Sequence, residues 1–364
     1  MERRTFLKSA AIGAAAATTL ATPAIAQGTR RWRMVSAWPR NLPGPGVAAQ
    51  MLADRIATLS GGRIEVELFA AGEVVPGPGV FDAVGEGTAD LYHAVPAYWG
   101  SKSKGILLFG SQPLGLTAME QHGWMLHGGG QALYDEMYAR FNLKPFLCGN
   151  SGPQWAGWFR NEVSSVDDLR GLKYRTTGLN SEVMAKLGVA VEAMSGPAMF
   201  QALQSGALDA GEFIGPWTDS ALGLQQITKL YYNNGVGEPS SAEECAVNLD
   251  SWNDLPDDLK QAVSFAAESL YNPVLTEYNT KHAMALRELV NTHGVEVKDW
   301  PQEIIVAQGR AMGEIVGELL ENEDELVRRI TQSFLDYRGL MADYQPNAEA
   351  AQLAARRLVP DYPR

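Results

Sequence analysis

The chain has 364 residues, a formal net charge of −12 at pH 7 and only two cysteines. The excess of acidic residues argues against nucleic acid or an anionic membrane surface as a partner, and two cysteines exclude a disulfide-rich scaffold. We expect Cys148 and Cys245 to be buried free thiols, with a disulfide between them as the alternative. A chain of this length is expected to divide into two lobes rather than to form one core.

The first 26 residues have the pattern of an export signal. Residues 2–8 contain four charged residues, among them Arg3 and Arg4. An alanine-rich apolar run follows and ends in Ala-Ile-Ala at 24–26, which has the small residues typical of a cleavage site. The run is too short and too rich in alanine for a membrane span. We therefore expect a twin-arginine signal peptide over residues 1–26 and a mature protein in the periplasm. An ordinary secretory signal that happens to contain two adjacent arginines is the alternative.

From residue 29 onward, strands and helices alternate, which is typical of an α/β fold. The first block predicts strands at 32–37, 63–69, 90–95 and 144–148, and helices at 46–59, 80–86 and 118–141. The second block predicts strands at 158–162, 173–176, 189–193, 210–214 and 245–249, and helices at 181–187 and 197–205. Three adjacent glycines at 128–130 predict a break in the helix at 118–141.

The C-terminal third is predicted to be helical. Asp254 is expected to cap a helix that Pro273 kinks and that stops near Gly294; a long helix over 301–338 and a short one over 348–358 follow. We expect one lobe from 29–150 with about 214–255 and a second lobe from 151–213 with about 256–300. The remaining segment, 301–364, is expected either to pair two copies of the chain or to pack on its own lobes.

No catalytic motif is recognisable. None of the five histidines lies in a zinc-binding pattern, and the sequence has neither a serine nucleophile elbow nor a phosphate-binding glycine loop. We therefore predict that the chain is not an enzyme.

Polar residues instead collect where predicted strands end, namely Gln154, Arg160, Arg175, Glu212 and Glu238. In open α/β sheets, ligands bind beyond the carboxyl ends of strands, so a small-molecule site is expected there. A structural salt bridge explains Arg175 as well as a ligand role does, and explains Arg160 better.

Several motifs in chain order resemble the binding proteins of TRAP (tripartite ATP-independent periplasmic) transporters. They are AAGEVVP at 70–76, DAV at 82–84, GTAD at 87–90, DLRGLKYR at 168–175, ALQSGALDAGE at 202–212 and WNDLP at 252–256. The stretch GNSGPQ at 149–154, together with Glu212 and Glu238, is most similar to the branch that binds α-keto acids. The resemblance implies a two-lobed periplasmic binding protein that closes on its ligand by a hinge and hands it to a membrane permease.

The resemblance also implies a set of roles for individual residues. Arg175 would hold the substrate carboxylate, because a guanidinium donates two parallel charge-assisted hydrogen bonds. A sodium or calcium ion would bridge protein and substrate, held by Gln154, Glu212, Glu238 and the carbonyl of Phe213. Gln154 and Glu212 would thereby also lie at the substrate. Asn150 would donate to the keto or hydroxyl oxygen, and Tyr98 and Trp99 would shape the pocket from the first lobe.

The sequence departs from this branch at Phe213, where a tryptophan is usual, and at Val236-Gly237, where an aromatic pair is usual. The stretch around Tyr98 also has one aromatic residue fewer. These departures leave the size of the substrate open more than its carboxylate. We predict a binding subunit for a small 2-oxo or 2-hydroxy monocarboxylate. The alternatives are a dicarboxylate, a larger acid or a zwitterion, a metal-dependent periplasmic enzyme using Glu212 and Glu238, and a structural or sensory subunit that binds no solute.

Overall fold

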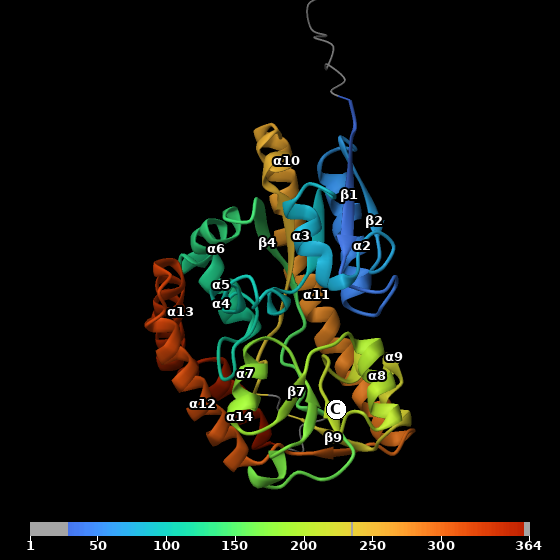
Figure 1. The fold of residues 1–364 in the computed structure, drawn as a ribbon, viewed down its shortest axis with the longest axis vertical. Coiled ribbons are helices and arrows are strands. Elements are labelled where there is room, and N and C mark those ends of the chain that lie inside the picture. The colour runs from blue at the N-terminus through green and yellow to red at the C-terminus, as the bar shows by residue number, and fades with distance from the viewer. Residues whose placement is uncertain (1–27, 234–235, 360–364) are drawn as a thin grey trace, which may run out of the picture.

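The protein has two β-sheets, one in each of two lobes, which lie above and below each other in Figure 1. The computed structural model describes residues 28–233 and 236–359, so the predicted signal peptide lies outside the described residues. The predicted α/β class and two-lobed architecture are confirmed.

The first lobe is built on a five-stranded sheet with the order β2-β1-β3-β10-β4. Its strands are β1 (Arg30–Ser36), β2 (Ile64–Phe69), β3 (Leu91–Ala94), β4 (Leu143–Asn150) and β10 (Ala242–Asn248). The first three are parallel, and β10 runs antiparallel between β3 and β4. Its helices are α2 (Pro45–Leu59), α3 (Val80–Gly85), α4 (Lys104–Leu107), α5 (Ala118–His127), α6 (Gly130–Ala139) and α10 (Leu249–Asn253).

The predicted break in the helix at 118–141 is confirmed, because α5 ends at His127 and α6 begins at Gly130. Gly129 has a φ of 82°, a left-handed conformation that glycine adopts without a steric penalty. The start of α5 is fixed by a capping box, in which the Thr117 hydroxyl accepts from the Glu120 amide and the Glu120 carboxylate accepts from the Thr117 amide.

The second lobe is built on a six-stranded sheet with the order β11-β9-β5-β8-β6-β7. Its strands are β5 (Gly157–Phe159), β6 (Lys173–Arg175), β7 (Ala190–Glu192), β8 (Ala210–Gly211), β9 (Leu230–Tyr232) and β11 (Glu296–Lys298). Its helices are α7 (Gly178–Lys186), α8 (Gly196–Ser205) and α9 (Pro216–Leu222). The expected boundary, which put 214–255 in the first lobe, was therefore wrong for β9, because this strand pairs with β5 and β11.

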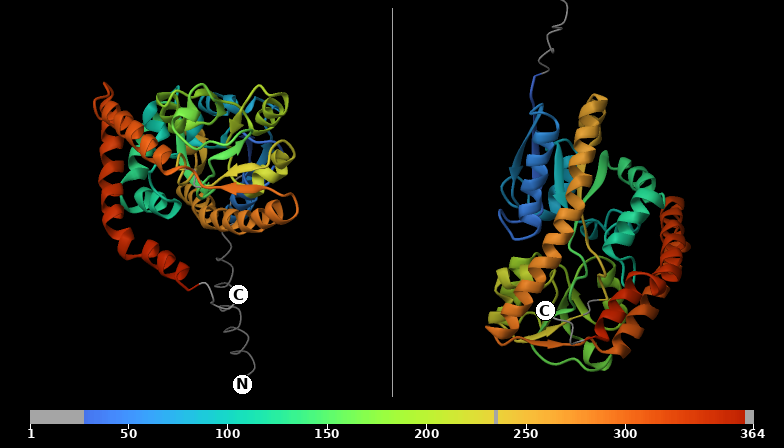
Figure 2. Two further views of the ribbon diagram at one scale, coloured as in Figure 1. Left: turned by 90° about the horizontal axis from the view of Figure 1, so that it is seen from below. Right: turned by 180° about the vertical axis from the view of Figure 1, so that it is seen from behind.

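The longest helix, α11 (Asp257–Asn291), crosses the boundary between the lobes. It packs against α2 and β4 of the first lobe and against α9 of the second, and it runs through both halves of the molecule in Figure 2. Its predicted N-cap was wrong: Asp254 is the C-cap of α10, its carboxylate pairs with Arg30 at 2.6 Å, and α11 starts only after Pro256. Expected as part of the second lobe, α11 instead belongs to both.

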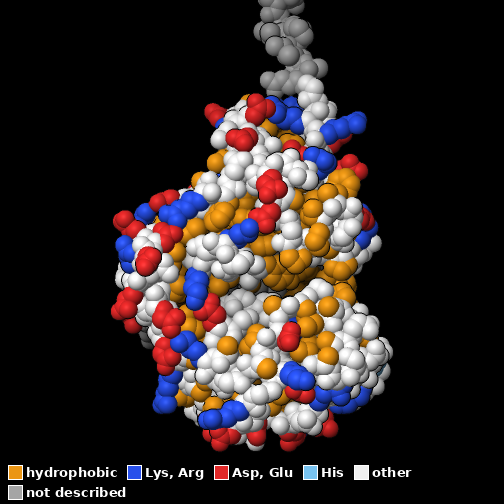
Figure 3. All heavy atoms as spheres, viewed as in Figure 1, with side chains coloured by type: hydrophobic (Ala, Val, Ile, Leu, Met, Phe, Trp, Pro, Cys, Tyr) orange, Lys and Arg blue, Asp and Glu red, His pale blue; other side chains and the backbone are white. Residues whose placement is uncertain are grey.

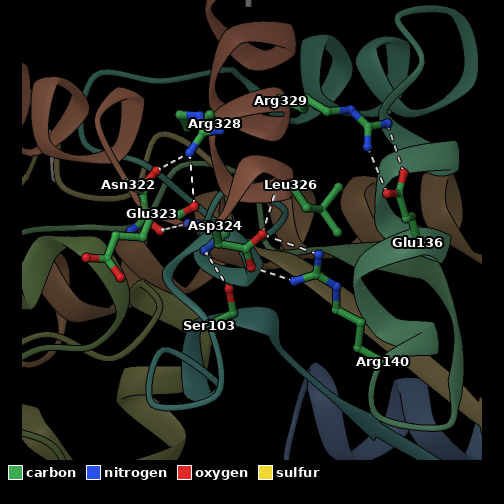
Figure 4. A network of polar contacts seen from close by, with 10 residues as sticks. Ser103, Glu136, Arg140, Asn322, Glu323, Asp324, Leu326, Arg328 and Arg329 are labelled. Carbon is green, nitrogen blue, oxygen red and sulfur yellow. Dashed lines mark hydrogen bonds and ion pairs between the residues drawn. The ribbon is translucent and has the colours of Figure 1, made fainter.

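The predicted long helix over 301–338 was also wrong, since the segment forms α12 (Gln302–Leu320) and α13 (Glu325–Tyr344). The turn between them is held by polar contacts, which Figure 4 shows. Asp324 caps α13 by accepting from the Leu326 amide at 2.9 Å and forms an ion pair with Arg140, the C-cap residue of α6. Arg329 makes a bidentate pair with Glu136 of the same helix, at 2.8 and 2.9 Å.

The two C-terminal helices attach to different lobes. α12 packs against α7, where Lys186 pairs with Glu318 at 2.9 Å, and α13 packs against α4, α5 and α6. The last helix, α14 (Glu349–Arg357), extends away from the body (Figure 2). The helices α12 and α13 therefore contact both lobes and join them, in addition to α11.

A buried polar cluster joins the first sheet to α11. The indole nitrogen of Trp38 donates to His93 Nδ1 at 2.9 Å, and His93 Nε2 lies 3.5 Å from the Glu243 carboxylate. The Tyr278 hydroxyl on α11 donates to the other oxygen of Glu243 at 2.7 Å. Because Nδ1 accepts from Trp38, neutral His93 carries its proton on Nε2, facing Glu243.

Both cysteines are buried free thiols, as expected. Burial raises the pKa of the Cys148 thiol well above its usual range, and the neighbouring Cys245 raises it further.

Candidate binding site

The predicted site residues occupy strand ends and connecting loops at the boundary between the lobes. Asn150 ends β4 and Arg175 ends β6; Glu212 and Phe213 directly follow β8. Gln154 lies in the chain crossing from β4 to β5, and Glu238 lies in the crossing from β9 to β10. Figure 3 shows the waist between the lobes, bordered by apolar side chains. Arg175 and Glu212 lie together because β6 and β8 are parallel neighbours and end at the same edge of the second sheet; Asn150, Gln154 and Glu238 reach this edge on the chain segments that cross between the lobes.

Arg175 is held in a fixed position at this boundary and is only 2% exposed. Its Nη1 donates to the Glu212 carbonyl at 2.5 Å and to the Glu212 carboxylate at 3.2 Å, and its Nε donates to the Met194 carbonyl at 2.9 Å. The Phe213 ring lies 5.5 Å from the guanidinium carbon, as measured to the ring centroid. The guanidinium is therefore oriented before any ligand arrives, and its planar fork suits a carboxylate.

Gln154, Glu212 and Glu238 line one small cavity of ≈ 10 Å³. The Gln154 Oε1 and Glu212 Oε2 atoms are buried there without a hydrogen-bond partner. A buried oxygen with no donor is costly, and an oxygen-seeking cation removes that cost. The donor set of one amide and two carboxylates fits sodium or calcium. Within 28–233 and 236–359, no group of three or more His, Cys, Asp and Glu residues is arranged so that it could hold a metal ion by itself.

The electrostatics of the two glutamates point the same way. Burial raises the pKa of Glu212 to about 7, although the charge of Arg175 lowers it. Burial and the Glu212 carboxylate raise the pKa of Glu238 well above its usual range, again against the effect of Arg175. Two carboxylates that resist ionisation side by side are stabilised as anions by a bound cation.

Tyr98 faces this cluster from the first lobe. Burial raises the pKa of its hydroxyl to about 12, and Arg175, Glu212 and Glu238 are the charged groups that act on it. Trp99 is turned away: its indole nitrogen donates to Glu244 at 2.6 Å, inside the first-lobe core. The structure therefore brings Tyr98, but not Trp99, to the predicted site.

Asn150 is fully buried, and its amide group is fully used. Its Nδ2 donates to Gln121 at 2.9 Å and to the Tyr271 hydroxyl at 3.0 Å, and its Oδ1 accepts from the Gly152 amide at 2.8 Å. These contacts tie β4 to α5 and α11. A hydrogen bond from Asn150 to a substrate requires one of them to open. Arg160, whose structural role was favoured, donates to the Leu203 carbonyl.

Asp219, which is 1% exposed in the first turn of α9, was not identified from the sequence. Its carboxylate accepts from five donors, namely the amides of Ile214 and Gly215, the hydroxyls of Thr218 and Tyr231, and the indole of Trp158. It thereby fixes the loop that follows Glu212 and Phe213. An isolated aspartate inside a helical pattern carries no signal of such a role.

Thr176 and Thr177 were also missed, although they directly follow Arg175. Both lie close enough to Glu212 to lower its pKa, and Ser241 and Thr177 lower the pKa of Glu238, in each case against the larger effect of burial. Their position after a candidate binding residue was the available signal.

Comparison with known proteins places this arrangement among solute-binding proteins. The family model described as "Bacterial extracellular solute-binding protein, family 7" matches residues 35–323. The monocarboxylate 2-oxoacid-binding periplasmic protein of Nostoc sp. is 38% identical over 314 residues, which are 84% of this chain and 86% of that protein.

Two solved structures share the fold closely. A TRAP transporter solute-binding protein from Bordetella bronchiseptica, with calcium and picolinate bound, has 30% identity and a TM-score of 0.88, over 91% of this chain and 98% of that one. A TRAP periplasmic solute-binding protein from Pseudoalteromonas atlantica, with sodium and pyruvate bound, has 30% identity and a TM-score of 0.86, over 90% of this chain and 99% of that one. Among the described residues, no helix combines the length and apolar character that a membrane crossing needs.

Proposed function

Since this chain belongs to the bacterial extracellular solute-binding proteins of family 7, we propose that it captures a small 2-oxo or 2-hydroxy monocarboxylate together with a sodium or calcium ion. Family membership makes the chain an extracytoplasmic solute-binding protein of the TRAP type rather than an enzyme, as predicted. We also propose which solute and cation bind, which residues hold them, and that a membrane permease receives the solute.

The observation that carries the proposal is the pairing of Arg175 with a cavity of unpaired oxygens. A carboxylate ligand placed on Arg175 would also lie near Glu212 and Glu238, and three anions would repel one another. A cation supplies the missing positive charge when bound. The protein's own contribution is to present Gln154 Oε1 and Glu212 Oε2 without competing donors. The relatives that bind pyruvate or picolinate with a metal ion support this choice of ligand class.

We propose the following division of roles during capture. Arg175 binds and orients the carboxylate, while Gln154, Glu212, Glu238 and the Phe213 carbonyl hold the cation. Tyr98 closes over the site from the first lobe when the lobes come together, which excludes water. Only a ligand that binds the closed form more tightly than the open one drives this closure.

The test is calorimetric titration of protein refolded without ligand, using pyruvate, lactate and longer 2-oxo acids, each with and without sodium and calcium. Arg175→Ala should weaken binding by about 100-fold or more, because it removes a charge-assisted contact. Arg160→Ala, another second-lobe arginine bonded to a backbone carbonyl, is the matched control and should bind as the wild type. Binding that needs no cation would refute the metal site, and equal affinity in Arg175→Ala would refute the carboxylate assignment.

We further propose that the chain is exported through a twin-arginine signal and forms a homodimer. The export proposal is supported by the sequence alone and predicts that replacing Arg3 and Arg4 with lysine retains the precursor in the cytoplasm. The dimer is supported by the apolar side chains exposed on α13 and α14, which are Leu340, Tyr344 and Leu353. Light scattering should give twice the monomer mass, and removal of residues 345–364 should halve it; a wild-type monomer would refute the dimer.

A further inference from the structure

Asn180 sits beside the cation cavity in a position that no motif identified. It lies in the first turn of α7, is 5% exposed, and lines the same cavity as Gln154, Glu212 and Glu238. Its Nδ2 donates to the Thr176 hydroxyl oxygen at 2.9 Å, while its Oδ1 is buried without a hydrogen-bond partner.

Three unpaired oxygens therefore border one cavity: Gln154 Oε1, Glu212 Oε2 and Asn180 Oδ1. Each is an acceptor that lacks a donor, and each carries negative charge or partial negative charge. An anion would be repelled by this set and an apolar group would leave all three desolvated. A hard cation satisfies all three, and the cavity volume of ≈ 10 Å³ admits a single small particle.

The other end of the Asn180 amide holds Thr176, the residue that directly follows Arg175. Asn180 Nδ2 donates to the Thr176 hydroxyl oxygen at 2.9 Å, which fixes that side chain beside the site. Thr176 in turn lowers the pKa of Glu212, against the larger effect of burial. Such outer contacts tune metal affinity in other proteins by 10- to 100-fold.

The loop that carries Glu238 depends on the same side chain. A Cβ atom added at Gly237 would lie 2.4 Å from Asn180 Cγ, so the loop backbone rests directly on the amide. Asn180 therefore contacts the supports of both glutamates, Thr176 on one side and Gly237 on the other.

We propose that Asn180 is a cation-positioning residue of this site, contributing its carboxamide oxygen to the cavity while its amide nitrogen fixes Thr176 beside Arg175. This inference rests on the proposed cation site but not on the identity of the acid. It concerns a residue to which neither the sequence motifs nor the comparisons assign a role.

The experiment is calorimetric titration of refolded, metal-free protein with calcium alone and with sodium alone, in the absence of any acid. Asn180→Ala should weaken calcium binding about 10- to 100-fold. Asn180→Asp restores an oxygen and adds a negative charge, so it should bind calcium more tightly than Asn180→Ala and raise the ratio of calcium to sodium affinity above the wild-type value. A purely structural role would not move this ratio. Ser181→Ala, in the same helical turn but outside the cavity lining, should match the wild type.

The outcomes separate the two proposals. Wild-type protein that binds neither cation overturns the proposed metal site and the role of Asn180 with it. Wild-type binding with unchanged affinity in Asn180→Ala overturns the role of Asn180 alone, as does a ratio in Asn180→Asp equal to that of the wild type. If Asn180→Ala does not fold, as judged by circular dichroism, the ratio measured for the near-isosteric Asn180→Asp decides.

Discussion

Replacing Glu243 with glutamine should make the free energy of unfolding depend on pH between 4.5 and 6.5. In the wild-type protein the effects of Glu243 and His93 cancel in this range, whose limits are the unperturbed pKa values of glutamate and histidine. Glu243 faces His93 across 3.5 Å in the buried cluster between β3, β10 and α11. Both groups are almost inaccessible to water, so their charged forms are disfavoured in the folded state.

The two residues act on stability in opposite directions. Burial raises the pKa of Glu243 from 4.5 to about 7, so its contribution to stability is fully present below pH 4.5 and is lost as the pH rises through about 7. Burial lowers the pKa of His93 from 6.5 to about 3, so its contribution is present above pH 6.5 and is lost as the pH falls toward about 3. Between these limits the folded state holds the proton on Glu243 and the unfolded chain holds it on His93, so the proton count is equal.

Substituting either Glu243 or His93 removes one of the two opposing effects, so the remaining residue alone sets the pH dependence of stability in this range. Each unmatched proton changes the free energy of unfolding by about 1.4 kcal/mol per pH unit, so over about two units the change is roughly 3 kcal/mol. Relative to wild type, Glu243→Gln should lose roughly this amount as the pH falls from 6.5 to 4.5. His93→Gln should show a change of similar size and opposite sign.

Urea denaturation followed by circular dichroism at several pH values and constant ionic strength measures these slopes. The packing cost of each substitution shifts a curve without tilting it, and the remaining titrating groups are common to all three proteins. Glu243→Gln and wild-type curves that run parallel between pH 4.5 and 6.5 would refute the reasoning.

Three further predictions follow from other contacts. Asp219→Ala leaves four buried donors unpaired, since the Thr218 hydroxyl can donate to the Gly215 carbonyl instead. It should lower the free energy of unfolding by about 3–5 kcal/mol in urea denaturation; a loss below about 1 kcal/mol would contradict the network described. Lys104→Ala removes the ion pair of 2.8 Å with Glu182 between the lobes and should weaken ligand binding by up to about fivefold, a difference that should vanish in high salt. Lys102→Ala, which removes a pair with Asp82 within the first lobe, should leave ligand binding unchanged. Cys148 and Cys245 should resist a thiol reagent until the protein is denatured, and rapid labelling of the native protein would show that they are accessible.

The sequence was informative where local pattern and tertiary environment agree. Strand 63–69 alternates apolar and polar residues and forms β2, and the glycines at 128–130 separate α5 from α6. The proximity of Arg175 and Glu212 could be anticipated because both lie at the ends of predicted strands, whereas Glu238 follows β9, which the sequence did not predict. A residue at a strand end is placed by the sheet, so its location depends little on details that the sequence leaves open.

Prediction was weaker where distant parts of the chain decide the outcome. The break between α12 and α13 is fixed locally by the Asp324 cap, and Arg140, which lies far away in the sequence, adds an ion pair to this turn. Trp99 resembled a pocket residue by its place beside Tyr98, yet a buried carboxylate on β10 turns it into the core. Asn180 has no motif, and its significance appears only when Thr176 and Gly237 are seen on either side of it.

The position of β10 constrains how this chain reaches its native state. The strand lies between β3 and β4, although most of the second sheet is encoded between β4 and β10. While the ribosome is making residues up to about 241, β3 and β4 lack the partner that joins them, and their edges are open to mispairing. The first lobe therefore matures late, after most of the second, and a fragment ending at residue 150 should not fold alone. Exchanging a lobe between relatives will succeed only if both of its chain segments are moved together.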